Sequence, residues 1–139
     1  MDINVIPFNE RATPTKNPID LNISAVEIVE LLLHQAVTSR ASDIHLESRE
    51  GALSVRYRID GLLSRGPDIT RQQSAVLSRL KILANMDIAE KRRPQDGKFS
   101  FSGSNGELDV RVSTLPGIHG EKIVLRLLNR SDQNLSADH

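Results

Sequence analysis

Residues 42–66 read SDIHLESREGALSVRYRIDGLLSRG, and this stretch decides the class of fold. Apolar and polar side chains alternate over 42–48 and again over 53–60, the period-two pattern of strands that are buried on one face. The connections are short, because only residues 49–52, with Arg-Glu-Gly at 49–51, separate the two runs and an Asp-Gly turn at 60–61 ends the second. Strands joined by such tight turns are antiparallel neighbours.

One helix is predicted before this stretch and one after it. Apolar residues recur at helical spacing from Ile23, and Ser24 with Glu27 has the capping-box pattern, which predicts a helix over about 25–40. Thr70 can cap a second helix over 71–86.

The last third of the chain again has the pattern of strands, at 98–103, 107–115 and 122–128, with 103–106 as a hairpin turn. The order is therefore one helix, three strands, one helix and three strands. It predicts an α+β fold, an antiparallel sheet flanked by two main helices.

Composition and length predict one folded domain, at 23–130, in a chain of 139 residues. A flexible, proline-broken N-terminal arm (1–22) and a polar C-terminal tail (131–139) flank it. There is no cysteine, and the longest apolar run, at 31–33, is far too short for a membrane span, so we expect a cytoplasmic protein.

The charge balance argues against a nucleic-acid partner. Lys+Arg and Asp+Glu number 18 each, and aromatic residues make up only 3%, too few for a base-stacking platform. The sequence also has no G-x-x-x-x-G-K-[ST] loop, no G-x-S-x-G and no paired histidines. We therefore expect no catalytic residues and no metal site in this chain.

One face of the predicted sheet carries arginines. Arg56 and Arg58 share a face, Arg111 lies opposite the apolar side of its strand, and Arg126 lies on the polar side of the last strand. A solvated polar face is the alternative interpretation, in which Asp109 and Arg111 pair with each other, or with Arg58 and Asp60 across the sheet.

A second basic feature is the loop AEKRRPQDGKFSF, residues 89–101. Pro94 disfavours helix at Arg93, and the Asp-Gly pair at 96–97 is expected to bend the chain into the next strand. This geometry could hold Arg92, Arg93 and Lys98 at a sheet edge, where guanidinium groups match phosphate oxygens. The alternative is an ordinary basic surface turn.

The segments ASDIHLE (41–47), RYRIDG (56–61), RLKILANMDIAEKRRPQDGK (79–98) and LDVRVSTLPGIHGEKIVLRLL (108–128) resemble the traffic ATPases of type II secretion and type IV pilus assembly. The resemblance is to the domain that precedes their RecA-like ATPase core. It covers roughly residues 22–130, in the order and spacing of the family.

The resemblance implies a PAS-like domain that docks on ATPase cores within a hexameric ring and reaches the inner-membrane secretion platform only indirectly. It implies that Arg111, Arg93 and Lys98 contact the phosphates of a nucleotide held elsewhere. The family usually has arginine after PQDG, and Lys98 keeps the charge but loses the bidentate geometry. ATP and Mg²⁺ would bind to the core. The chain alone would bind no cofactor and would catalyse no reaction.

Two other interpretations stay open. The chain could be a free-standing interaction protein of the same fold that regulates a partner ATPase or secretion component, and a Met1 start is compatible both with this and with a fragment of a longer protein. Nucleic-acid binding through the arginine face ranks last.

Overall fold

The computed structural model describes residues 23–103 and 106–129. The described residues form two helices and six strands, in the order predicted from the sequence, which confirms the α+β fold. The elements are α1 (Ala25–Thr38), β1 (Asp43–Arg49), β2 (Ala52–Ile59), β3 (Leu62–Arg65), α2 (Gln73–Leu83), β4 (Gln95–Gly103), β5 (Gly106–Gly117) and β6 (Gly120–Asn129). The predicted arm, the tail and the centre of the 103–106 turn lie outside the described residues.

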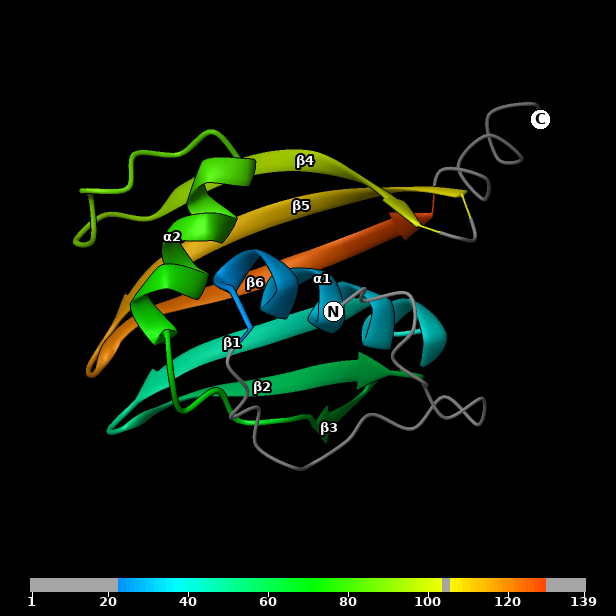
Figure 1. The fold of residues 1–139 in the computed structure, drawn as a ribbon, viewed down its shortest axis with the longest axis horizontal. Coiled ribbons are helices and arrows are strands. Elements are labelled where there is room, and N and C mark those ends of the chain that lie inside the picture. The colour runs from blue at the N-terminus through cyan, green and yellow to red at the C-terminus, as the bar shows by residue number, and fades with distance from the viewer. Residues whose placement is uncertain (1–22, 104–105, 130–139) are drawn as a thin grey trace.

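All six strands belong to one antiparallel sheet, in the order β3-β2-β1-β6-β5-β4 (Figure 1). The first three strands and the last three each form a meander, and the two meanders join where β1 pairs with β6. In that central pairing Leu46 lies opposite Ile123. The turn after β2 has two residues, Asp60 and Gly61, both with positive φ, as a type I′ hairpin requires.

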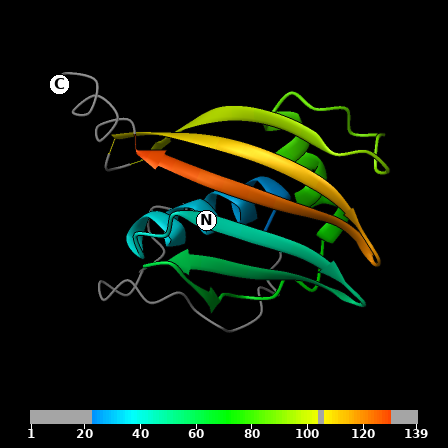
Figure 2. The same cartoon turned by 180° about the vertical axis from the view of Figure 1, so that it is seen from behind.

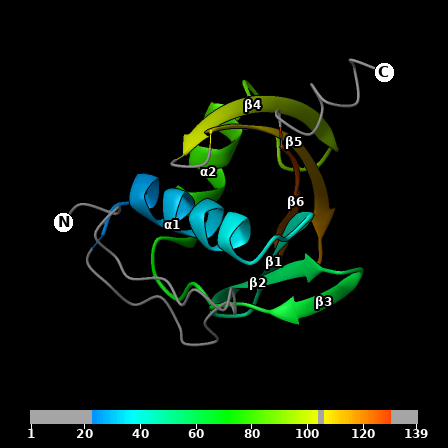
Figure 3. The same ribbon diagram turned by 90° about the vertical axis from the view of Figure 1, so that its right-hand side faces the viewer.

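Both helices lie on the same face of the sheet (Figures 1 and 2). The sheet curls around α1, as Figure 3 shows, so the core lies between this concave face and the two helices. Every second residue of the central strands points into the core, including Ile44, Val55, Val110 and Leu125. No described helix covers the opposite face. Neither described helix is both long and apolar enough to cross a bilayer.

The start of α1 follows the prediction. Ser24 Oγ accepts a hydrogen bond from the Glu27 amide at 3.2 Å, and the Ser24 amide donates to Glu27 Oε1 at 3.1 Å, so the capping box is complete. The helix ends at Thr38, two residues earlier than predicted, because the chain reverses at Arg40 with φ of 59°.

The start of α2 corrects the prediction. Thr70 does not cap the helix: the N-cap is Gln72, with φ of 62° and no side-chain capping bond, and α2 begins at Gln73. The reason lies just upstream, where the backbone of buried Ile69 pairs with Leu53 through hydrogen bonds of 2.8 and 2.9 Å. This bridge fixes the approach of the chain, and the Gln72 side-chain amide donates to the carbonyl of Ile23 instead.

The Asp-Gly pair before Lys98 also corrects a prediction. Asp96 and Gly97 do not bend the chain, because both already belong to β4 and pair with Ser113 and Val112. Glycine is required there for contact rather than for a turn: a Cβ at Gly97 would lie 2.4 Å from the carbonyl oxygen of Ala84. The end of α2 can therefore rest directly on the first residues of β4.

Candidate phosphate-contact face

Five charged residues line up across the uncovered face of the sheet. The strand pairing places Lys98 opposite Arg111, Arg111 opposite Arg126, Arg126 opposite Asp43, and Asp43 opposite Arg58. Each of these side chains comes from a different strand, from β4 at one edge to β2 near the other. We call this set the cross-strand row. It confirms the prediction that the arginines gather on one face.

Asp43 neutralises one end of the cross-strand row. Its side chain is only 7% exposed, and it lies between two guanidinium groups. Oδ1 is 3.2 Å from Nε of Arg126, and Oδ2 is 3.3 Å from Nε of Arg58. Arg58 also donates from Nη1 to the carbonyl of Gly61 at 2.9 Å. These two arginines are therefore engaged by the fold itself.

The other end of the cross-strand row has no such counter-ion. Within residues 23–103 and 106–129, neither Arg111 nor Lys98 makes a side-chain hydrogen bond or an ion pair, and both side chains are exposed. They border a hollow of about 380 Å³ on the uncovered face, which Ser100 and Asp109 also line. Asp109 accepts a hydrogen bond from Ser100 Oγ at 3.2 Å. The hollow thus combines two cations with one carboxylate.

Arg93 lies apart from this pair. It precedes β4 in the loop after α2, five residues before Lys98, which corresponds to roughly 15 Å of extended chain. Its side chain is 87% exposed, and its Nε lies 3.8 Å from Oε1 of Glu90. The structure therefore brings Arg111 and Lys98 together and leaves Arg93 on a separate loop.

Sequence reasoning missed Asp43. The residue begins β1, and the signal that could have identified it is its place in the strand alternation, on the same side as the polar residues. The predicted alternative paired Asp109 and Arg111 with each other, or with Arg58 and Asp60 across the sheet. The structure instead pairs Arg58 with Asp43.

The fold and this face define a class of protein: an α+β domain whose sheet is packed on one side and offers exposed cations on the other. A family model described as "Type II/IV secretion system protein" matches residues 21–139, and the chain belongs to this family. The membership that the four sequence segments predicted is confirmed.

Curated relatives agree. The chain is 45% identical over 115 residues to "Type II secretion system protein E" of Pseudomonas aeruginosa, a match that covers 82% of this chain and 23% of the relative. It is 49% identical over 106 residues to the protein of the same name in Xanthomonas campestris pv. campestris, covering 76% and 19%. It is 44% identical over 111 residues to "Type II secretion system ATPase E" of Vibrio cholerae, covering 79% and 22%. The chain thus spans about a fifth to a quarter of the length of these relatives.

Proposed function

We propose that this chain acts as a non-catalytic domain of a type II secretion or type IV pilus traffic ATPase. It docks on RecA-like ATPase cores and supplies cations to the phosphates of nucleotide bound there. Two facts support the assignment: the Vibrio cholerae relative is named an ATPase, and this sequence has no phosphate-binding loop of the G-x-x-x-x-G-K-[ST] type. ATP and Mg²⁺ are accordingly bound by the core and not by this chain.

The observation that carries the proposal is the pairing of Arg111 with Lys98 at the rim of the hollow. Both cations stand on strands packed against the core, so their backbone positions are rigid, and neither has a counter-ion among the described residues. A planar guanidinium can donate two hydrogen bonds to one phosphate, and the ammonium group adds a point charge beside it. Such donors act by offsetting the negative charge that grows on the phosphoryl oxygens in the transition state.

Arg93 has a secondary role in this proposal. It extends from a loop and not from a strand, so it reaches the nucleotide from a different direction than Arg111. Because a long exposed side chain loses conformational freedom on binding, its contribution is smaller than that of a cation on a strand.

The wider setting is part of the same proposal. The domain works within a hexameric ring in the cytoplasm, is related in fold to PAS domains, and is peripheral to the inner membrane through its partners. Each subunit then offers its uncovered sheet face to the nucleotide site of an ATPase core, in its own chain or in a neighbouring one.

The decisive experiment mixes the purified chain with ATP, Mg²⁺ and a separately purified RecA-like core of the family, and measures phosphate release from each alone and from both together. We expect no turnover from the chain alone and faster turnover from the mixture. Tight Mg²⁺-dependent binding of ATP by the chain alone would overturn the proposal. Binding to the core without any change in turnover would instead favour a free-standing interaction protein.

A further inference from the structure

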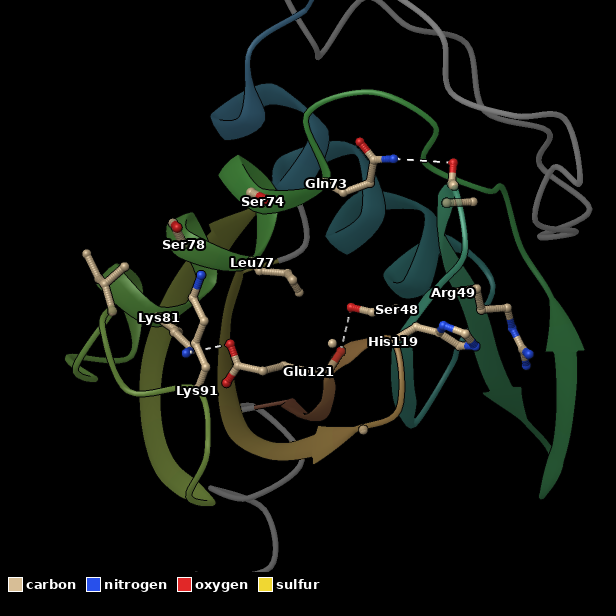
Figure 4. Close-up of a pocket in the computed structure, with 15 residues that line it drawn as sticks. Ser48, Arg49, Gln73, Ser74, Leu77, Ser78, Lys81, Lys91, His119 and Glu121 are labelled. Carbon is tan, nitrogen blue, oxygen red and sulfur yellow. Dashed lines mark hydrogen bonds and ion pairs between the residues drawn. The ribbon is translucent and has the colours of Figure 1, made fainter.

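Lys81 of α2 is a buried lysine with two specific partners. It is 1% exposed, and its ammonium group lies 2.6 Å from Oε1 of Glu121 and donates to the carbonyl oxygen of Glu90 at 2.7 Å. Figure 4 shows the ammonium group directed at the Glu121 carboxylate, beside a hollow of about 280 Å³ between α2 and two hairpin turns. A buried ammonium group must be paired, so the Glu121 carboxylate and the Glu90 carbonyl are required to lie beside it.

The pair connects α2 to the sheet. Glu121, at the start of β6, is 5% exposed, and its backbone carbonyl accepts a hydrogen bond from Ser48 Oγ of β1 at 2.7 Å. Its second carboxylate oxygen is buried and finds no hydrogen-bond partner among the described residues. Apolar side chains that fill the same volume are often as stable as a buried ion pair. What the pair adds is a directed hydrogen bond to Glu90.

That hydrogen bond fixes the loop that carries Arg93. The loop is held at Asp87 by the Gln95 side chain, with hydrogen bonds of 2.9 and 3.0 Å. The carbonyl of Glu90 accepts a hydrogen bond of 2.7 Å from Lys81 and a longer one of 3.4 Å from the Gln95 side-chain amide. The Glu90 carboxylate in turn lies 3.8 Å from Nε of Arg93. Lys81 is therefore linked to Arg93 through one residue.

We propose that Lys81 and Glu121 are positioning residues: the pair holds the loop 87–93 so that Arg93 is presented at a fixed place relative to the sheet that carries Arg111. The inference rests on the proposed role of Arg93 in contacting phosphate. A loop that is already ordered loses less conformational entropy when its arginine engages a ligand.

The first test measures loop order in the full chain. In the double variant Lys81→Met with Glu121→Leu, apolar groups replace both charges, and we expect folding with a similar melting temperature. The amide of Glu90, which donates to the carbonyl of Asp87 at 3.3 Å, should exchange its hydrogen at least about tenfold faster once the loop is released. Arg93→Ala is the matched control, because it keeps the link from Lys81 to Glu90 and should leave this exchange unchanged.

Unchanged exchange in the folded double variant overturns the inference. If the double variant does not fold, Lys81→Met combined with Glu121→Gln replaces it, since the amide keeps the shape of the carboxylate and carries no charge. Release of the loop in that variant supports the inference, and an unchanged loop refutes it.

The second test measures turnover in the mixture with the ATPase core. The double variant should lose the same fold-change as Arg93→Ala, and combining the changes should cost nothing more, because both act through one side chain. A merely structural role predicts losses that multiply, and that result would refute positioning. If Arg93→Ala has no effect on turnover while the loop is still released in the double variant, Arg93 leaves the proposed function and the positioning role fails with it, although Arg111 remains testable independently.

Discussion

One end of the cross-strand row contains a carboxylate that pairs with its arginines, and the other end does not. Towards β2, Asp43 pairs with Arg58 and Arg126, and both guanidinium groups are held against the sheet. Towards β4, Arg111 and Lys98 have the same kind of backbone support but no counter-ion among the described residues. The same strand geometry therefore produces two different environments for positive charge.

This contrast separates the cations that stabilise the fold from the cations that are available to bind a ligand. An arginine that already pairs with a buried carboxylate must give up that pairing before it can bind phosphate. An arginine that faces only water gives up weaker interactions. Four experiments test how the charged and ionisable side chains of this face behave.

The largest effect is expected from Arg111→Ala in the mixture with an ATPase core. Turnover should fall by about a hundredfold or more, as for the loss of an arginine that stabilises a phosphoryl-transfer transition state. The folded fraction should not change, because the side chain is exposed and unpaired within the described chain. Phosphate release and circular dichroism measure the two quantities.

Arg56→Ala is the matched control for Arg111→Ala. Arg56 is an exposed arginine on the same face, on β2 next to the neutralised end of the row. Its loss should leave turnover within error of the parent. Equal losses for the two variants would show that overall charge, and not the position of Arg111, matters.

The second experiment removes the carboxylate that neutralises one end of the cross-strand row. Asp43→Asn keeps the volume of a nearly buried side chain but removes the charge that holds two guanidinium groups. The free energy of unfolding should fall by about 1.5–3 kcal/mol, the usual range for hydrogen bonds to a charged group. Urea titration of the variant beside the parent provides the measurement. An unchanged midpoint would mean that Arg58 and Arg126 gain as much from water as from Asp43.

The third experiment changes Lys98, at the end of the cross-strand row that has no counter-ion among the described residues. Lys98→Arg places a planar guanidinium donor opposite Arg111. One additional charge-assisted hydrogen bond, worth about 1 kcal/mol, should raise core-stimulated turnover roughly fivefold. The matched change Lys91→Arg, on the loop before β4, should have no effect. A decrease in turnover for Lys98→Arg would indicate that two adjacent guanidinium groups repel each other more than they bind.

The smallest effect concerns His45 of β1, which lies opposite Arg56. Burial, followed by the charge of Lys122, lowers the pKa of His45. The unfolded chain then binds the proton more readily, so stability that is present above about pH 6.5 is lost as the pH falls through and below that value. The melting temperature of the parent should therefore drop more between pH 7.5 and 5.5 than that of His45→Gln. His119→Gln, on the exposed β5–β6 turn, is the control and should follow the parent.

Much of the fold could be predicted from local patterns. The alternation in β1, β2, β5 and β6 places one set of side chains in the core, and burial of that set leaves only one orientation for each strand. The capping box of Ser24 and Glu27 marks the start of α1 for an equally local reason. Such features depend on residues within a few positions of each other.

The predictions that failed depend on distant contacts. Thr70 has the right chemistry for a helix cap, but the pairing of Ile69 with Leu53 sets the direction of the chain first. The Asp-Gly pair at 96–97 has the composition of a turn, yet β5 and the end of α2 hold it in a strand. Local propensity gave way to tertiary packing in both places.

The candidate site shows the same limit. The family resemblance named Arg111 and Lys98, but only the register of β4 against β5 shows that they are neighbours. Asp43 reaches both Arg58 and Arg126 because β1 lies between β2 and β6, and no local pattern specifies that order. Lys81 lies where a lysine is rarely expected, since charged residues are almost never fully buried unless paired.

The join between β1 and β6 has a consequence for synthesis of the chain on the ribosome. Asp43 and Arg126 are 83 residues apart, and the strands that carry them pair directly at the centre of the sheet. The first meander can form early, but its inner edge stays unpaired until the last strand has been translated. The nascent chain therefore exposes a bare strand edge, open to pairing with other chains, from the completion of the first meander at Arg65 until β6 has been made.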